Sequence, residues 1–354
     1  MRSPAVDSGP VVGETTVGFR FAHSGGDGIR AVRLVQDVRI PGDQLDFARD
    51  GDAWELTIAR PDVWRMEYQL ELTHADGGTE HVCDPANPLR APGAFGEKSE
   101  LRMPGYREPS WVAGAPAPGA VAETTVQARA LGTEVAARIW SPPGTRDDER
   151  LPLLVAHDGP EYDELAGLTT YLGVLVEAGR LPRLRAALLP PGPRDDWYSG
   201  DGAYTRALCL AIVPQLERSV ATSVVVGMGA SLGGFAMLHA QRRHPTTFDA
   251  LFLQSGSFFH PRLDAHERRF SHYDRIVRSV DGILRAGGHR SPVPVVLTCG
   301  RIEENIANNR MMARALAAQG YDVALRELPD VHNYTAWRDA FDPHLTRLLR
   351  MVTA

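Results

Sequence analysis

Two patterns of hydrophobic and polar residues divide the chain. From Thr16 to about Val82, short stretches alternate apolar and polar residues, and turns rich in Gly and Asp, such as 25–28 and 50–52, separate them. This alternation places apolar side chains on one face, as in antiparallel strands. The clearest stretches are 17–21, 31–35, 54–58 and 64–72, the last with Met66, Tyr68, Leu70 and Leu72 on one face. We therefore expect a small β-sandwich without long helices.

Beyond about residue 115 the pattern changes to buried strands that alternate with helices. The stretch 113–120 is rich in Ala, Pro and Gly, as in segments that join domains, so we predict domains 1–115 and 116–354. After a hairpin at 124–140, apolar runs predict strands at 151–157, 185–189, 223–227, 250–254, 293–298 and 322–328, with helices at 164–177, 204–220, 232–244 and 309–319. This alternation predicts a doubly wound α/β sheet.

Composition and charge narrow the functional classes. The 354 residues are 43% hydrophobic and 23% charged, which suits a folded globular protein. A net charge of −6 argues against nucleic acid as a partner, because such binding relies on Lys and Arg. Residues 1–7 lack the apolar core of a signal peptide and no apolar run is long enough to span a membrane, so we expect a cytoplasmic protein without membrane contact. The three cysteines lack metal-ligand spacing, so we expect reduced thiols, no metal and no cofactor.

The sharpest chemical signal is a G-x-S-x-G motif centred on Ser231. It follows the strand predicted at 223–227 and precedes the helix predicted at 232–244. Small residues two positions before and after the serine let the backbone turn sharply and lift the hydroxyl above the sheet. A Gly/Ser cluster after a strand can be only a turn, but a strand before it and a helix after it favour a catalytic role. We therefore predict Ser231 as a nucleophile.

A serine nucleophile needs a histidine base and a carboxylate that orients it, and in this fold the chain order is Ser, acid, His. Of the 12 histidines, only His332 lies in a loop between the last predicted strand and the terminal helix, so we predict it as the general base. Glu303 follows the strand at 293–298, at the edge where α/β sheets place their sites, and is the predicted acid. Glu304 and Asp330 are the alternatives. Alternatively, the glutamates are favourable charges at the start of the next helix.

The mechanism also needs two backbone N–H donors for the developing oxyanion. The N–H of Leu232, next to the nucleophile, is the first predicted donor. The second is expected in the loop after the strand at 151–157, from Gly159 or Glu161, because Pro160 between them has no N–H.

With these residues placed, the second domain resembles the enterochelin-esterase (ferric enterobactin esterase) branch of a family of α/β-hydrolases. That family also includes S-formylglutathione hydrolase and the mycolyltransferases. The likeness covers about 120–350 and rests on His157-Asp158-Gly159, Gly229 to Phe235, 254–259, Cys299 to Asn309, and His332 followed five residues later by Trp337-Arg338. In the N-terminal part, Asp84-Pro85-Ala86-Asn87-Pro88 matches a segment that ends the family's immunoglobulin-like β-sandwich.

The resemblance implies a function and additional site residues. It implies a serine esterase that hydrolyses a small-molecule siderophore ester, such as a catecholate trilactone, in the cytoplasm and so releases iron for iron transport. It places the catalytic acid at Glu303 and the sandwich at the substrate entrance. It also implies that Arg194 and Trp337 contact the substrate, although Arg194 could be an ordinary solvated loop residue.

Two other functions are compatible with the sequence. One is an acyltransferase of the mycolyltransferase type, which passes the acyl group to an alcohol. The other is a catalytically inert protein that binds a glycan or a partner, with Trp54 and Trp64 stacking on sugars; at alternating strand positions such residues are more often core. The order of Ser231, Glu303 and His332 favours an enzyme. The natural ester and the oligomeric state are left open.

Overall fold

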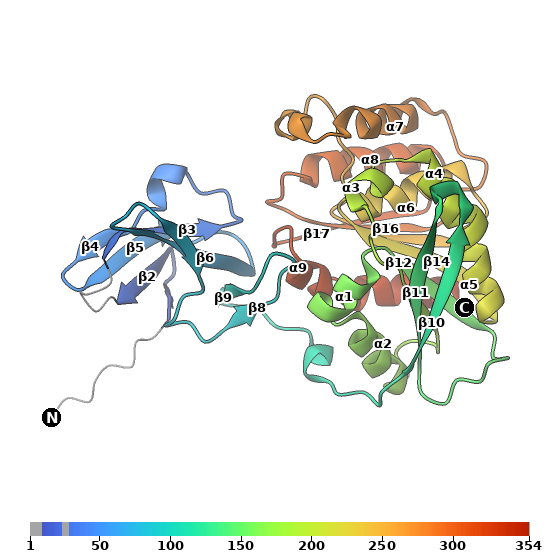
Figure 1. Cartoon of the computed structure of the whole chain (residues 1–354), viewed down its shortest axis with the longest axis horizontal. Helices are drawn as coiled ribbons and strands as arrows, with labels where there is room; N and C mark the ends of the chain where they lie inside the picture. Colours follow the sequence, from blue (N-terminus) through green and yellow to red (C-terminus); the bar gives the residue numbers. More distant parts are fainter. Residues whose placement is uncertain (1–8, 23–27, 354) are drawn as a thin grey trace. The chain divides into compact units, whose positions relative to one another are not determined.

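The computed structural model describes residues 9–22 and 28–353, so residues 1–7 and most of the turn predicted at 25–28 lie outside the described chain. The chain divides into two compact units (Figure 1). The first consists of residues 1–107 with Pro329–Thr335, and the second of residues 108–328 with 336–354. The boundary predicted near residue 115 thus lies at 107/108. The assignment of Pro329–Thr335 to the first unit was not predicted.

The first unit contains two antiparallel sheets. One has the strand order β1-β2-β5-β4, and the other has the order β3-β6-β9-β8 with β7 paired to β6. The strands are β1 (Val11–Val12), β2 (Thr16–Ala22), β3 (Ile29–Gln36), β4 (Ala48–Asp50), β5 (Ala53–Ala59), β6 (Arg65–His74), β7 (Thr79–Val82), β8 (Arg90–Ala91) and β9 (Lys98–Arg102). The ring of Phe19 on β2 meets that of Tyr68 on β6 edge to face, with centroids 5.2 Å apart, so the two sheets share a core.

The first four residues of strand β6 are buried on both faces of the strand. Met66, Tyr68, Leu70 and Leu72 are at most 5% exposed and line the core, as their alternation predicts. The opposite face is expected to be polar and exposed. Instead, Arg65 is 0% and Glu67 is 2% exposed. Charged side chains are rarely so buried unless they are paired, so Arg65 and Glu67 are expected to have charged partners on this face.

The second unit is built on an eight-stranded sheet with the order β10-β11-β13-β12-β14-β15-β16-β17. The strands are β10 (Ala120–Ala128), β11 (Thr133–Ser141), β12 (Leu151–Ala156), β13 (Arg185–Leu188), β14 (Thr222–Ala230), β15 (Ala250–Gln254), β16 (Val295–Gly300) and β17 (Val323–Leu328). Strands β10, β11 and β13 pair antiparallel, and all later pairs are parallel. The mixed sheet with interleaved helices confirms the predicted α/β-hydrolase fold with a preceding β domain.

Helices lie on both sides of this sheet (Figure 1). They are α1 (Gly159–Ala166), α2 (Leu168–Glu177), α3 (Arg194–Tyr198), α4 (Gly202–Ala207), α5 (Val213–Ser219), α6 (Leu232–Arg243), α7 (Tyr273–Arg285), α8 (Ile306–Ala318), α9 (Tyr334–Asp339) and α10 (Thr346–Val352). The single helix predicted at 164–177 is two helices, because Gly167 adopts φ 62° and ends α1. A π-helical turn, Leu208–Ile212, joins α4 to α5. Helix α7 was not predicted.

Three observations bear on the functional classes weighed from the sequence. Cys83, Cys209 and Cys299 are free thiols, and burial raises the pKa of Cys209 to about 11, so this thiol is unreactive at neutral pH. Trp54 is 7% exposed and belongs to the core, whereas Trp64 is 37% exposed. Among the described residues, no helix has both the length and the apolar character needed to cross a membrane.

Candidate active site

Ser231 occupies a sharp turn between strand β14 and helix α6. Its backbone has φ 55° and ψ −123°, a conformation that residues with a side chain rarely adopt. A Cβ added to Gly229 would lie 2.5 Å from the carbonyl carbon of Gly233, so this close crossing of the chain requires glycine. The strand, turn and helix predicted around Ser231 are therefore present, and the turn is of the kind that exposes a serine hydroxyl.

The loop after the neighbouring strand β15 holds this turn in place. The Ser231 N–H donates to the Gln254 carbonyl at 2.9 Å, and the Ser257 N–H donates to the Ser231 carbonyl at 3.0 Å. The Ser231 and Ser257 hydroxyl oxygens are 3.2 Å apart. With both main-chain groups engaged, the backbone of the turn is fixed while the Ser231 side chain stays partly exposed.

Three non-glycine residues with positive φ lie just beyond adjacent strands of the sheet. Asp158 follows β12 with φ 51°, Ser231 follows β14 with φ 55°, and Ser255 follows β15 with φ 47°. Each such residue stores strain of roughly 1–3 kcal/mol, and strained residues concentrate at functional sites. Glu303 lies close beyond the next strand, β16. The carboxyl edge of β12, β14, β15 and β16 is therefore the candidate site.

Glu303 is a buried acceptor at this edge. It is 5% exposed, and its Oε1 accepts from the Gly300 N–H at 2.6 Å and from the Ser255 hydroxyl at 2.8 Å. The Trp337 indole donates to the same Ser255 oxygen at 3.1 Å. These bonds orient the carboxylate. The sequence analysis did not identify Ser255 as one of the donors.

The two alternative acids have other partners. Glu304 is exposed, and its carboxylate lies 3.1 Å from the His266 ring. Asp330 belongs to the first unit and accepts from Arg65 at 2.9 Å. The surroundings of the three candidates thus favour Glu303, whose role as the acid remains a prediction.

His332 lies in the loop between β17 and α9, as the sequence predicts. It is half-buried and belongs to the segment Pro329–Thr335, which groups with the first unit. Ser231 and Glu303 belong to the second unit. The role of His332 as the base therefore also remains a prediction.

The two predicted oxyanion donors differ in their surroundings. Leu232 begins α6, and the first N–H groups of a helix have no acceptor within it. The Gly159 N–H, in contrast, donates to the Leu189 carbonyl at 2.9 Å. A Cβ at Gly159 would lie 2.3 Å from Leu188 Cα, so this glycine serves the packing of α1 on β13 rather than an approach to substrate. The other candidate for the second donor, Glu161, lies in the first turn of α1, where N–H groups have no acceptor within the helix, and its role remains a prediction.

The residues predicted to contact substrate are both engaged with the protein. Arg194 forms a two-pronged pair with Asp158, with Nε and Nη2 each 2.9 Å from a carboxylate oxygen, while its side chain stays 33% exposed. Trp337 is 8% exposed. A substrate role for either stays a prediction, and the structure adds that Arg194 stabilises the strained Asp158.

Two sets of buried polar residues that support the site were missed. His157, 0% exposed, lies between the Gly233 carbonyl at Nδ1 (3.1 Å) and the Tyr204 hydroxyl at Nε2 (2.8 Å). Burial lowers its pKa to about 4, so it is neutral and donates from Nδ1. Asn309 bonds both the N–H and the carbonyl of Gly256. Both residues fall in segments that carry the family resemblance, but pattern alone does not reveal a buried hydrogen bond.

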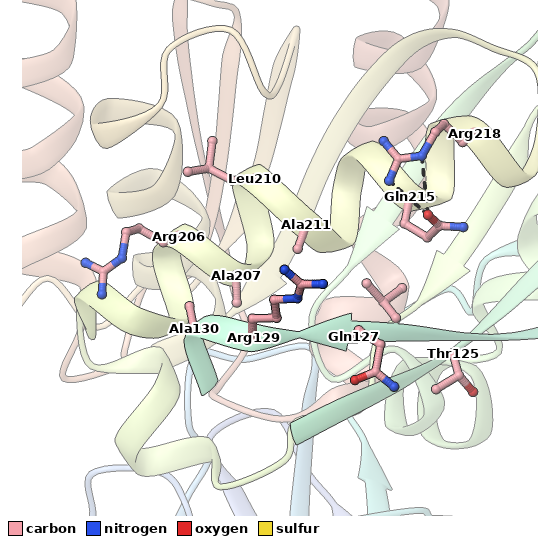
Figure 2. Close-up of a pocket in the computed structure, with 11 residues that line it drawn as sticks. Thr125, Gln127, Arg129, Ala130, Arg206, Ala207, Leu210, Ala211, Gln215 and Arg218 are labelled. Atoms are coloured by element: carbon pink, nitrogen blue, oxygen red, sulfur yellow. Dashed lines mark hydrogen bonds between the residues drawn. The ribbon is translucent and has the colours of Figure 1, made fainter. Parts of the chain in front are cut away.

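Two other features of the second unit include neither the predicted nucleophile nor the predicted acid or base. A groove of about 710 Å³ is lined by Arg129, Arg206 and Arg218 beside the exposed Leu210, and it includes none of the candidate catalytic residues (Figure 2). Among the described residues, one group, His266, Glu267 and Glu304, has potential metal-ligand atoms within 4.8 Å of one another. It is on the surface, where such groups are common without a metal.

The fold and the strained serine turn define an α/β-hydrolase. Residues 128–348 match the model of a family described as Putative esterase, and the chain belongs to this family. The Iron(III) enterobactin esterase of Dickeya dadantii is 27% identical over 328 residues, which cover 81% of this chain and 74% of that protein.

Solved structures give the same picture. The enterobactin esterase from Shigella flexneri, determined in the presence of 2,3-dihydroxy-N-benzoyl-glycine, matches with a TM-score of 0.76 at 19% identity and covers 98% of this chain and 97% of its own. The ferric enterobactin esterase from Salmonella typhimurium matches at 0.75 and 21% identity, covering 96% and 95%. These structures establish the shared fold over both units. The resemblance to the enterochelin esterases is thus confirmed, and the comparisons support an esterase.

Proposed function

We propose that the protein is a serine esterase that acts through an acyl-enzyme, with Ser231 as nucleophile, His332 as general base and Glu303 as the acid that orients it. The observation that carries the proposal is the strained turn at Ser231, φ 55°, between a buried strand and a helix. A buried, hydrogen-bonded carboxylate, Glu303, lies two strands away at the same edge of the sheet.

The proposed reaction has two halves. Ser231 Oγ attacks the ester carbonyl carbon while His332 takes the hydroxyl proton, and the oxyanion receives hydrogen bonds from the Leu232 and Glu161 N–H groups. The bond to the leaving alcohol then breaks, and His332 returns the proton to that alcohol. In the second half, water attacks the acyl-enzyme, His332 accepts its proton, and collapse releases the carboxylic acid and restores the Ser231 hydroxyl.

For the substrate we propose a siderophore ester of the catecholate trilactone kind, in either its ferric or its iron-free form. The support is the 27% identical enterobactin esterase, together with fold matches over nearly the whole chain. Arg194, partly exposed beside Asp158, is the cation proposed to contact a catecholate oxygen. Iron then belongs to the substrate, and its release would supply iron transport.

Product analysis tests this proposal. The protein is incubated with ferric and iron-free catecholate trilactone and with p-nitrophenyl butyrate, each in the presence and absence of a simple alcohol, and products are read by mass spectrometry. The expected products are the linear trimer, the dimer and the monomer of the acylated serine, with one water added for each ester bond hydrolysed. Transfer of the acyl group to the alcohol in preference to water would indicate an acyltransferase instead. Cleavage of p-nitrophenyl butyrate without any cleavage of the trilactones would contradict the proposed substrate and leave the proposed esterase mechanism standing.

A further inference from the structure

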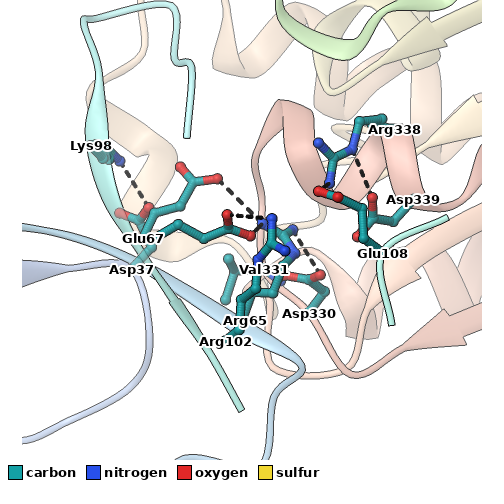
Figure 3. Close-up of polar contacts among 11 residues, drawn as sticks. Asp37, Arg65, Glu67, Lys98, Arg102, Glu108, Asp330, Val331, Arg338 and Asp339 are labelled. Atoms are coloured by element: carbon teal, nitrogen blue, oxygen red, sulfur yellow. Dashed lines mark hydrogen bonds and ion pairs between the residues drawn. The ribbon is translucent and has the colours of Figure 1, made fainter. Parts of the chain in front are cut away.

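The first unit buries a cluster of charged side chains on the outer face of β6. Arg65 Nη1 lies 3.7 Å from Glu67 and 3.6 Å from Glu100, and Arg65 Nη2 donates to Asp330 at 2.9 Å (Figure 3). Arg102 contacts the second oxygen of Glu100 at 3.0 Å. Arg65 is 0% exposed and its three carboxylates are 1–3% exposed, so the cluster is withdrawn from water.

Within this cluster, Asp330 is the close partner of Arg65. Its Oδ2 lies 2.9 Å from Arg65 Nη2, a hydrogen-bond distance, whereas the Glu67 and Glu100 oxygens lie 3.7 and 3.6 Å from Nη1. Burial raises the pKa of Glu67 to about 7, so Glu67 carries only part of a negative charge at neutral pH. A buried guanidinium always keeps its charge, so Asp330 and the more distant Glu100 together compensate it, with Asp330 at the shorter distance.

Asp330 in turn fixes the backbone next to His332. Its Oδ1 accepts from the Val331 N–H at 2.9 Å, so one carboxylate joins Arg65 to the residue just before the histidine. The Trp64 N–H, adjacent to Arg65, donates to the Pro329 carbonyl at 2.6 Å. The start of the segment Pro329–Thr335 is thus tied by backbone and side chain to the first residues of β6. This explains why the segment groups with the β-sandwich unit.

We propose that Arg65 is a positioning residue for catalysis, which through Asp330 fixes the loop that carries His332, so that the β-sandwich unit orients the general base of the hydrolase. This inference rests on the proposed function of His332. It gives the sandwich a part in the chemical step in addition to any part in substrate entry. A positioning role predicts a loss in kcat with little change in KM, because substrate contacts are untouched.

Four variants of the full chain test the proposal. Asp330→Asn keeps the shape and an acceptor for the Val331 N–H but removes the charge that pairs with Arg65. Arg65→Met removes the guanidinium, and Arg65→Lys restores a charge without its planar fork. Glu100→Gln is the matched control, because it perturbs the same buried cluster and leaves the Arg65–Asp330 pair in place.

Steady-state kinetics with p-nitrophenyl butyrate give the first readout. We expect Asp330→Asn and Arg65→Met to lower kcat by about 10- to 100-fold, the range for residues that orient a functional side chain from behind it, with KM changed less than about twofold. Arg65→Lys should fall between Arg65→Met and the parent, and Glu100→Gln should stay within about twofold of the parent. Equal losses in Glu100→Gln and Asp330→Asn would overturn the proposal.

A second readout separates positioning from general damage to the fold. Arg65→Met and Asp330→Asn are each combined with His332→Ala. If Arg65 acts through His332, neither change lowers the residual activity of His332→Ala any further. A further loss of the same size as in the parent means that the cluster only stabilises the protein, and the proposal fails. Full activity of His332→Ala alone would instead contradict the proposed function, so the two failures are distinguishable.

Discussion

The hydroxyl of Ser255 donates to the Glu303 carboxylate at 2.8 Å, and the same oxygen accepts the Trp337 indole N–H at 3.1 Å. Ser255 is also one of three non-glycine residues with positive φ among the described residues, and this strained backbone places its side chain against the Glu303 carboxylate. The Glu303 carboxylate thus has a fixed orientation before any substrate binds. Such preorganisation is what a carboxylate needs if it is to hold a histidine in one tautomer.

The first prediction concerns the identity of the acid. Glu303→Gln removes the charge that stabilises the protonated base and should lower kcat by about 10²–10⁴-fold, as loss of a triad carboxylate does. Glu304→Gln is the matched control one residue away, exposed and paired with His266, and should stay within about twofold. Kinetics on p-nitrophenyl butyrate check both. The reverse ranking would move the acid to Glu304.

The second prediction concerns the turn at the nucleophile. Gly229→Ala puts a Cβ 2.5 Å from backbone atoms that cannot move independently, so the turn must open and both activity and thermal stability should fall. Gly282→Ala, at an exposed position of α7 with no atom within 4 Å of the new Cβ, should raise the free energy of unfolding by about 0.5–1 kcal/mol with activity unchanged. Thermal unfolding followed by esterase assays checks the pair. A fully active Gly229→Ala protein would mean that the turn is not needed.

The third prediction concerns acid stability. Burial lowers the pKa of His157 to about 4 from its ordinary 6.5, so between these values the unfolded chain binds a proton that the folded chain excludes. The stabilising contribution is therefore complete above pH 6.5 and is lost as pH falls toward 4. His157→Asn keeps a donor for the Gly233 carbonyl but has no proton to gain. The drop in the free energy of unfolding between pH 7 and pH 4 should be smaller in this variant by about 3 kcal/mol.

Denaturant titrations of the two proteins at both pH values measure that drop. Half-buried His239 and His344, whose pKa values partial burial also lowers to about 4, remain in both proteins and cancel in the comparison. Equal drops in the two proteins would show that His157 does not carry this dependence.

The fourth prediction separates the two possible roles of Arg194. Asp158 is 3% exposed in its side chain, so Arg194→Met leaves a buried carboxylate unpaired and should lower thermal stability. Arg194→Lys keeps a charge for Asp158 but loses the planar guanidinium, which can donate to Asp158 and to a catecholate oxygen at the same time. If Arg194 also contacts the substrate, Arg194→Lys should raise KM for the catecholate trilactone more than KM for p-nitrophenyl butyrate. Equal effects on the two esters would leave Arg194 with a structural role alone.

The sequence predicted most of what depends on periodicity. The strands of the sheet and the helix after Ser231 lie where apolar runs and the G-x-S-x-G motif place them. Helix α7 was not predicted, although Ile276, Val280 and Ile283, spaced three or four residues apart, form its buried stripe. The break at Gly167 was missed because a glycine within a helical pattern signals a left-handed cap only when its φ is known.

The supporting contacts could not be predicted from the sequence. Arg65 and Asp330 are separated by 265 positions, and nothing in either local pattern marks a buried pair. Arg65 falls on the face of β6 that the alternation assigns to solvent, and its contacts there include Asp330, from the segment Pro329–Thr335, and the ring of Tyr106. Likewise, Gly159 has the flexibility expected of an oxyanion loop, but its N–H donates to the Leu189 carbonyl. This hydrogen bond depends on how the chain packs, which the residue type does not reveal.

The central claim is that Ser231 forms the acyl-enzyme. The direct measurement is mass spectrometry of the protein treated with a fluorophosphonate, followed by peptide mapping, with Ser231→Ala and Ser257→Ala treated in parallel. The account predicts one adduct per chain on the peptide that contains Ser231, retained in Ser257→Ala and absent from Ser231→Ala, which should also have lost esterase activity. An adduct on another residue, or full esterase activity in Ser231→Ala, would contradict it.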